Sequence, residues 1–160
     1  MPSETTDSLR NTGDDPEVIL VAVDTSNGST RVLAVAARLA RAFPAAPLHV
    51  VHVFRTSRFD RAHAGAPAPN SDALADAKEH LEFHVRQARQ QCRNAVTGHF
   101  IVGDPTAEIL RVRTEISADM LVIGTHDHSG FERLLLGSIA DNLMRKAGCS
   151  VLVVRPTKPR

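Results

Sequence analysis

The loop at 124–138 contains several glycine, serine and histidine residues. It links a short apolar segment at 120–123 to a segment with helical spacing at 138–147. Gly124 and Gly130 allow the backbone to turn sharply and to approach a ligand closely. Gly137 and Ser138 then begin the helical segment, whose first N–H groups and dipole attract negative charge. The pattern indicates a site that binds an anion, and it points towards phosphate. The same residues also fit a purely structural turn, because many α/β loops contain them without holding phosphate.

Three neighbouring residues of this loop offer metal-ligand chemistry. His126, Asp127 and His128 bring two imidazoles and a carboxylate, which are competent ligands for a metal ion. The sequence provides no obvious fourth ligand, and adjacent loop residues often point apart. We therefore interpret these side chains as solvated or facing a phosphate, and we expect no metal site. Protonation of the two histidines near neutral pH would make phosphate affinity depend on pH.

Four other histidines have ordinary structural interpretations. His49 and His52 fall on a predicted strand as partly buried residues. His80 and His84 are four residues apart on a predicted helix, a spacing that can bind metal but that more often belongs to a solvated face. No Ser/His/Asp or Cys/His arrangement stands out, so we expect no catalytic residues, and Ser138 is interpreted as a hydrogen-bond donor.

Apolar patterning places strands and helices in strict alternation, which predicts a doubly wound α/β fold with a parallel sheet and right-handed crossovers. Asp104 followed by Pro105 indicates a helix start, and Gly148 fits a helix C-terminus. The expected strands are 18–23, 48–54, 95–102, 120–123 and 151–154, and the expected helices are about 30–43, 71–92, 105–116 and 138–147. Ligands of such sheets bind beyond the carboxyl ends of the strands. The loops of interest are therefore 24–29, 53–55 and 124–138.

Composition limits the classes of protein to consider. The chain has 160 residues, 42% of them hydrophobic, and a formal net charge of +1, which suits one globular domain and gives no reason to expect nucleic acid or a membrane as partner. It contains no Trp or Tyr to stack on bases. We expect a disordered tail over 1–16, one domain over 17–156, and a short tail over 157–160. Cys92 and Cys149 lack CxxC spacing, and no apolar export segment or membrane span is visible, so a cytoplasmic protein with reduced thiols is expected.

Four stretches resemble the universal stress protein family, and together they cover almost the whole predicted domain. They are ILVAVDTS at 19–26, HVVHV at 49–53, GDPTAEIL at 103–110 and GTHDHSGFERLLLGSIADNLMRKAGCSVLVVRP at 124–156. The resemblance implies a five-stranded parallel sheet with strand order 3-2-1-4-5. It also implies a homodimer formed through the C-terminal strand, which carries an exposed apolar edge.

The ATP-binding branch of that family carries the pattern Gly-x2-Gly-x9-Gly-Ser/Thr. Gly124 matches its first glycine, Gly137 and Ser138 match its last pair, and Asp127 stands at the middle glycine. The resemblance places Asp24 near the adenosine and the backbone of Val53 against the adenine. The remaining residues that it places around the phosphates and ribose are Gly130, Gly137, Ser138 and Ile139.

Asp127 bears on which ligand the site takes. A carboxylate a few ångströms from a triphosphate repels it by a few kcal/mol at an effective dielectric constant of about 20. The side chain avoids this cost if it points to solvent or if Mg²⁺ bridges it to the phosphates. The leading interpretation is a dimeric stress-response or signalling protein that binds ATP or a related adenine nucleotide, with at most slow hydrolysis. The alternatives are a dimeric scaffold of the same fold that binds a protein partner and no nucleotide, and an enzyme proper.

Overall fold

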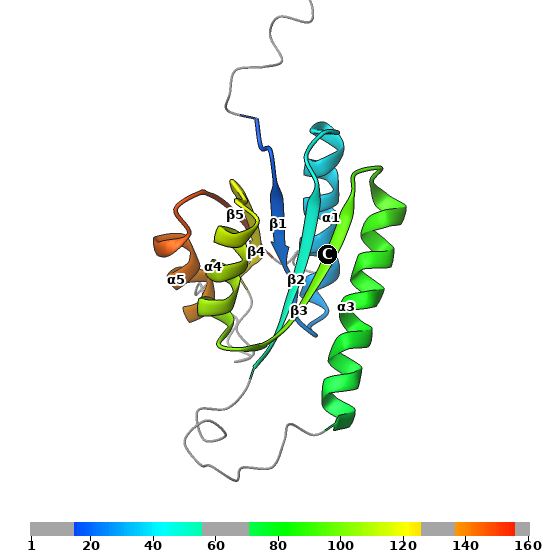
Figure 1. The fold of residues 1–160 in the computed structure, drawn as a ribbon, viewed down its shortest axis with the longest axis vertical. Coiled ribbons are helices and arrows are strands. Elements are labelled where there is room, and N and C mark those ends of the chain that lie inside the picture. The colour runs from blue at the N-terminus through cyan, green and yellow to red at the C-terminus, as the bar shows by residue number, and fades with distance from the viewer. Residues whose placement is uncertain (1–14, 56–70, 126–136, 156–160) are drawn as a thin grey trace, which may run out of the picture.

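The computed structural model describes residues 15–55, 71–125 and 137–155 (Figure 1). Five parallel strands form one sheet in the order β3-β2-β1-β4-β5, which confirms the predicted topology. The strands are β1 (Ile19–Ala22), β2 (Leu48–Arg55), β3 (Val96–Gly103), β4 (Met120–Gly124) and β5 (Ser150–Val154). The helices are α1 (Gly28–Ala42), α3 (Ser71–Gln91), α4 (Pro105–Glu115) and α5 (Ser138–Lys146). These bounds lie within two residues of those expected from the sequence.

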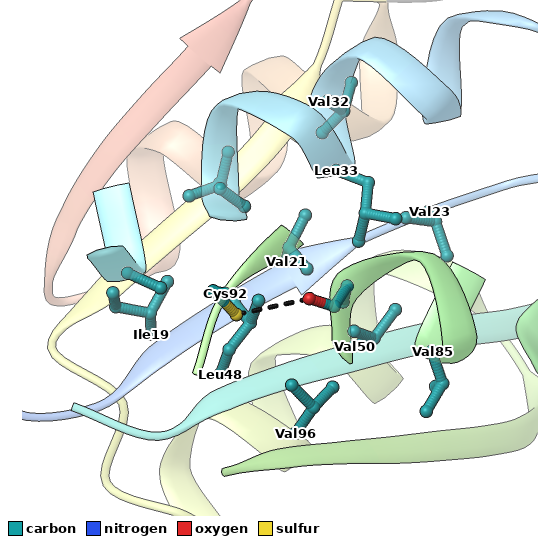
Figure 2. Packing of buried hydrophobic residues seen from close by; sticks show 14 of the residues in the cluster. Ile19, Val21, Val23, Val32, Leu33, Leu48, Val50, Val85, Cys92 and Val96 are labelled. Atoms are coloured by element: carbon teal, nitrogen blue, oxygen red, sulfur yellow. Dashed lines mark hydrogen bonds between the residues drawn. The ribbon is translucent and has the colours of Figure 1, made fainter. Parts of the chain in front are cut away.

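The helices cover both faces of the sheet because the central strands are apolar on both sides. Ile19 and Val21 of β1 pack with buried residues of α1 and α3, whereas Leu20 packs with buried residues of α4 and α5. In Figure 1, α1 and α3 lie on one side of the strands and α4 and α5 on the other. Figure 2 shows the α1/α3 core from close by, with the Cys92 thiol donating to the Ala88 carbonyl at 3.3 Å. Alternation of side chains along each strand thus builds two separate cores.

Local signals set several helix ends. The Asp104 side chain accepts a hydrogen bond from Ala107 N at 2.9 Å and Pro105 occupies the first turn of α4, as predicted. Gly148 has φ of +62°, which also agrees with its expected place after α5. Ser117, with φ of +55°, takes the same left-handed conformation after α4, where the amide of Ala118 returns to the carbonyl of Arg113.

Asn94 secures the C-terminal end of α1. Its amide Nδ2 donates to the carbonyl oxygens of Ala40 at 3.0 Å, Phe43 at 3.0 Å and Ala46 at 2.7 Å. The carbonyls of Ala40 and Phe43 also accept the backbone N–H groups of Phe43 and Ala46, so this side chain from the α3–β3 connection adds a second hydrogen bond to each. One residue therefore joins three points of the chain that lie about fifty positions away in sequence.

The structure corrects the interpretation of His84 as a solvated residue. His84 is only 4% exposed, while His80 lies on the exposed side of α3 as expected. The spacing explains the error: position 84 falls three residues after Leu81 and four before Ala88, in the middle of the buried stripe of α3. His84 Nδ1 lies 2.9 Å from the His80 carbonyl oxygen, which turns the ring back along its own helix.

Two further structural findings bear on the sequence-based expectations. Cys92 is buried, Cys149 is half-buried, and both are free thiols. No helix within the described ranges combines the length and apolar character needed to cross a membrane.

Candidate functional site

A cavity of about 560 Å³ opens at the carboxyl ends of the central strands, beside the first turn of α5. Six of the eight residues singled out from the sequence line it: Asp24, Val53, Gly124, Gly137, Ser138 and Ile139. They come from the ends of β1, β2 and β4 and from the start of α5, elements that the parallel topology brings to one edge. The other two, Asp127 and Gly130, lie outside the described residues, as do His126 and His128.

The turn after β1 lines the cavity, and Asp24 organises this turn. Its Oδ1 accepts hydrogen bonds from Ser26 N at 2.8 Å, Ser26 Oγ at 2.5 Å and Ser29 Oγ at 2.6 Å. The buried Ser29 hydroxyl also accepts from the backbone N–H of Asp24 at 2.7 Å. The carboxylate therefore holds the loop in a fixed turn, and Asp24 adds a negative group to the lining of the cavity.

Replacing Ser29 with alanine is expected to lower the free energy of unfolding by about 1–3 kcal/mol, since both its donor and its acceptor role disappear at a buried position. Chemical denaturation measures the change. The neighbouring Thr30→Ala, at an exposed position of α1, is the matched control and should cost less than about 0.5 kcal/mol. Equal stability losses in the two variants would contradict this role of Ser29.

The α5 end of the cavity suits an anion. Gly137 stands at the N-cap with extended backbone (φ −60°, ψ 153°), and no side chain among the described residues caps the first turn. The N–H groups of Ser138, Ile139 and Ala140 therefore have no partner within α5 and lie at the positive end of this nine-residue helix. Three arginines line the same cavity, Arg31, Arg55 and Arg155.

The opposite end of the cavity lies between β2 and α3 and carries polar groups that the sequence reasoning did not assign to the site. His52 from β2 lines it together with Asp76 and His80 from α3. The connection from β2 to α3 begins at the carboxyl edge of the sheet, so the first turns of α3 must return to that edge. Amphipathic spacing alone predicts that Asp76 and His80 are solvated. Only the return of α3 to the carboxyl edge of the sheet indicates that they adjoin the cavity.

The contacts of His52 fix the orientation of its ring, and its burial fixes the protonation state. The ring is 5% exposed, stacks on Phe100 with centroids 5.8 Å apart, and places Nδ1 3.0 Å from the Val23 carbonyl oxygen. Burial lowers the pKa of His52 below its ordinary value of 6.5, outweighing the opposing effects of that hydrogen bond and of the Asp24 charge. The ring is therefore neutral near pH 7.

His49 and His99 form a pair outside the cavity, on the face of the sheet opposite to His52. His49 Nδ1 and His99 Nε2 are 2.8 Å apart, and the rings stack at 5.1 Å. Burial lowers the pKa of both rings; the positive charge of His99 adds to the effect on His49. No group of three histidine, cysteine, aspartate or glutamate side chains in the described segments is placed to hold a metal ion.

Acid is expected to destabilise the fold through these rings. The pKa values of His49, His52, His84 and His99 all lie below 6.5 in the folded protein, so below that pH the unfolded chain binds more protons. The free energy of unfolding should fall as pH drops from about 7.5 to 5.5, by up to about 1.4 kcal/mol per pH unit for each ring that is protonated only when unfolded. Urea titrations across this range test the slope, and stability that stays constant or rises towards acid pH would contradict it.

Comparison with known proteins agrees with the fold. The family model described as "Universal stress protein family" matches residues 16–155. The universal stress protein MJ0531 of Methanocaldococcus jannaschii is 28% identical over 145 residues, which cover 88% of this chain and 82% of that protein. A universal stress protein structure from Archaeoglobus fulgidus superposes with a TM-score of 0.69 at 29% identity, covering 84% of this chain and 96% of the other.

A second Archaeoglobus fulgidus structure contains dAMP. It superposes with a TM-score of 0.65 at 28% identity and covers 84% of this chain and 94% of the other. The match of the family model over nearly the whole described chain, together with the parallel 3-2-1-4-5 sheet, establishes that this chain belongs to the universal stress protein family.

Proposed function

We propose that this chain binds ATP or a related adenine nucleotide in the cavity at the carboxyl ends of β1, β2 and β4, and acts in stress response or signalling. The observation that carries the proposal is the convergence of an uncapped first turn of α5, three arginines and the end of β2 on one cavity. The helix terminus and the cations attract phosphates, and the strand end offers backbone groups to a base. The dAMP complex of a 28% identical relative supports an adenine ligand.

The dimensions of the site also support the proposal. Neighbouring strands lie about 4.8 Å apart, so the end of β2 is about 10 Å from β4, the strand that leads towards α5. This spacing separates a base at β2 from phosphates at α5, with Asp24 of β1 between them beside the ribose. The proposal includes Mg²⁺, which Asp127 and the phosphates would hold and which would offset their like charges.

Freshly purified protein provides the direct test. Mass spectrometry after denaturation should release ATP, ADP or AMP, and added ATP should raise the melting temperature of nucleotide-free protein. A protein that carries no nucleotide and whose melting temperature does not respond to ATP would overturn the proposal. That result would favour the scaffold alternative, to which Asp127 at the middle glycine position points.

We further propose that the protein is a cytoplasmic homodimer joined through β5. This strand pairs with β4 on one side, and three consecutive apolar residues, Val151, Leu152 and Val153, are only half-buried. An edge of this kind favours pairing with a second chain, and two copies related by a two-fold axis would cover it. Light scattering should give twice the chain mass of 17.3 kDa, and a monomer mass at micromolar concentration would contradict the dimer.

A further inference from the structure

The hydrogen bond of His52 determines which of its ring nitrogens can meet a ligand. A carbonyl oxygen only accepts, so His52 Nδ1 must carry the proton that it donates to Val23 O. In the neutral ring Nε2 is then an acceptor. The hydrogen bonds of the described residues include no donor to Nε2, and His52 is one of the residues that line the cavity. The cavity wall therefore contains a hydrogen-bond acceptor whose tautomer is fixed by the backbone.

His84 of α3, which does not line the cavity, has the same pattern of ring hydrogen bonds as His52. Its Nδ1 donates to the His80 carbonyl, so its Nε2 is also an acceptor, and this buried atom has no hydrogen-bond partner among the described residues. His52, His84 and the Asp24 carboxylate lie within electrostatic range of one another. Neither the His84 Nε2 nor the Asp24 carboxylate can donate a hydrogen bond to His52. The Nε2 of His52 is therefore available to a donor on the ligand.

The neighbouring cavity groups point to the same ligand chemistry. Asp76 of α3 adds a second carboxylate to the cavity at the β2–α3 end, where Arg55 at the end of β2 also lies, whereas Arg31, Arg155 and the first turn of α5 gather positive charge elsewhere in the cavity. A ligand that spans the cavity with its phosphates at α5 presents its base to His52. A base that pairs with the His52 acceptor carries an N–H₂ group there rather than a carbonyl oxygen.

We propose that His52 Nε2 accepts a hydrogen bond from the exocyclic amino group of the bound base, and so selects 6-aminopurine over 6-oxopurine nucleotides. This inference rests on the proposed function and assigns the selection to one side chain. A 6-oxopurine places an acceptor oxygen against Nε2, and both groups then lose their hydrogen bonds on leaving water. His52 is thus a specificity-determining residue that reads the base without contacting the phosphates.

The test compares ATP with ITP, which differ in having an amino group or an oxygen at position 6 of the purine. Calorimetry on the full chain should give an ATP affinity at least about tenfold above that for ITP. His52→Phe keeps an aromatic ring for stacking on Phe100 and should bring the ratio close to one. His49→Phe is the matched control, because it removes an imidazole from the same strand outside the cavity, and it should keep the wild-type ratio.

A spectroscopic measurement on the unaltered protein guards against loss of folding in His52→Phe. Nitrogen-15 NMR at pH 7.5 should show His52 protonated on Nδ1, and adenosine should move the Nε2 resonance towards that of a hydrogen-bonded acceptor, whereas inosine should not. An unchanged ATP/ITP ratio in a folded His52→Phe protein, or protonation of His52 on Nε2, would overturn this inference alone. Failure of the unaltered protein to bind either nucleotide would instead overturn the proposed function.

Discussion

Ser138→Glu is expected to weaken ATP binding by at least about a hundredfold while leaving the fold as stable as before. Ser138 is the exposed first residue of α5 and lines the cavity. A carboxylate placed about 4 Å from a phosphate charge, at an effective dielectric constant of about 20, opposes binding by about 4 kcal/mol before salt screening. The same carboxylate lies at the positive end of the helix dipole, where it stabilises the helix by about 0.3–1 kcal/mol.

The opposite signs of these two effects make the result diagnostic. A variant that merely damaged the protein would lose stability and affinity together. Ser71→Glu is the matched control, because Ser71 is also exposed and also begins a helix, α3, but does not line the cavity. It should keep its ATP affinity within about twofold. Calorimetry and thermal denaturation measure the two quantities, and full ATP affinity in Ser138→Glu would contradict placement of the phosphates at α5.

Asn94→Asp is expected to cost about 3 kcal/mol or more in the free energy of unfolding. The Asn94 amide donates to three carbonyl oxygens at the end of α1, and a carboxylate at the same place has no proton to donate. The change removes all three of these hydrogen bonds, leaves the carbonyls of Ala40 and Phe43 with their backbone partners alone, and sets a negative charge against them, beside the negative end of the helix dipole. Asn94→Ala removes the donors without adding charge, so it should cost less, about 2 kcal/mol.

Asn142→Asp provides the comparison for this effect. The Asn142 amide donates to a single carbonyl, that of Ser138 at 2.8 Å, on the exposed side of α5. We expect a loss of about 1 kcal/mol or less there. Chemical denaturation of the three variants should give the largest loss for Asn94→Asp, a smaller one for Asn94→Ala and the smallest for Asn142→Asp. Equal losses for Asn94→Asp and Asn142→Asp would show that the three-carbonyl contact contributes nothing beyond one hydrogen bond.

The features that could be predicted from the sequence are those specified by neighbouring residues. Asp104 and Pro105 form a helix start within four positions of each other, and Gly148 meets a local backbone requirement. The alternation of strands and helices along the sequence is compatible with few sheet topologies. It therefore predicted both the parallel sheet and the edge of the sheet at which the cavity lies. Burial of His84 was also readable from its place in the stripe of α3, but the polarity of the residue outweighed its position in our interpretation.

The contacts that escaped prediction join residues far apart in sequence. Asn94 meets carbonyl groups about fifty residues away, and nothing local to it reveals that α1 ends there. His52 was interpreted as an ordinary strand residue, because its significance depends on the Val23 carbonyl of the neighbouring strand and on the return of α3 to the cavity. Periodicity identifies elements and faces, whereas the partners of a polar side chain depend on how those faces meet.

A nitrogen-15 NMR titration with ATP tests most directly whether the cavity binds an adenine nucleotide with its base at β2 and its phosphates at α5. The backbone amides of Val53, Gly124 and residues 137–140 should shift together with one dissociation constant. The His49–His99 pair, outside the cavity, should stay still and serve as an internal reference. If saturating ATP leaves the amide resonances of 137–140 unshifted, or shifts those around His49 and His99 instead, the nucleotide does not bind in this cavity with its phosphates at α5.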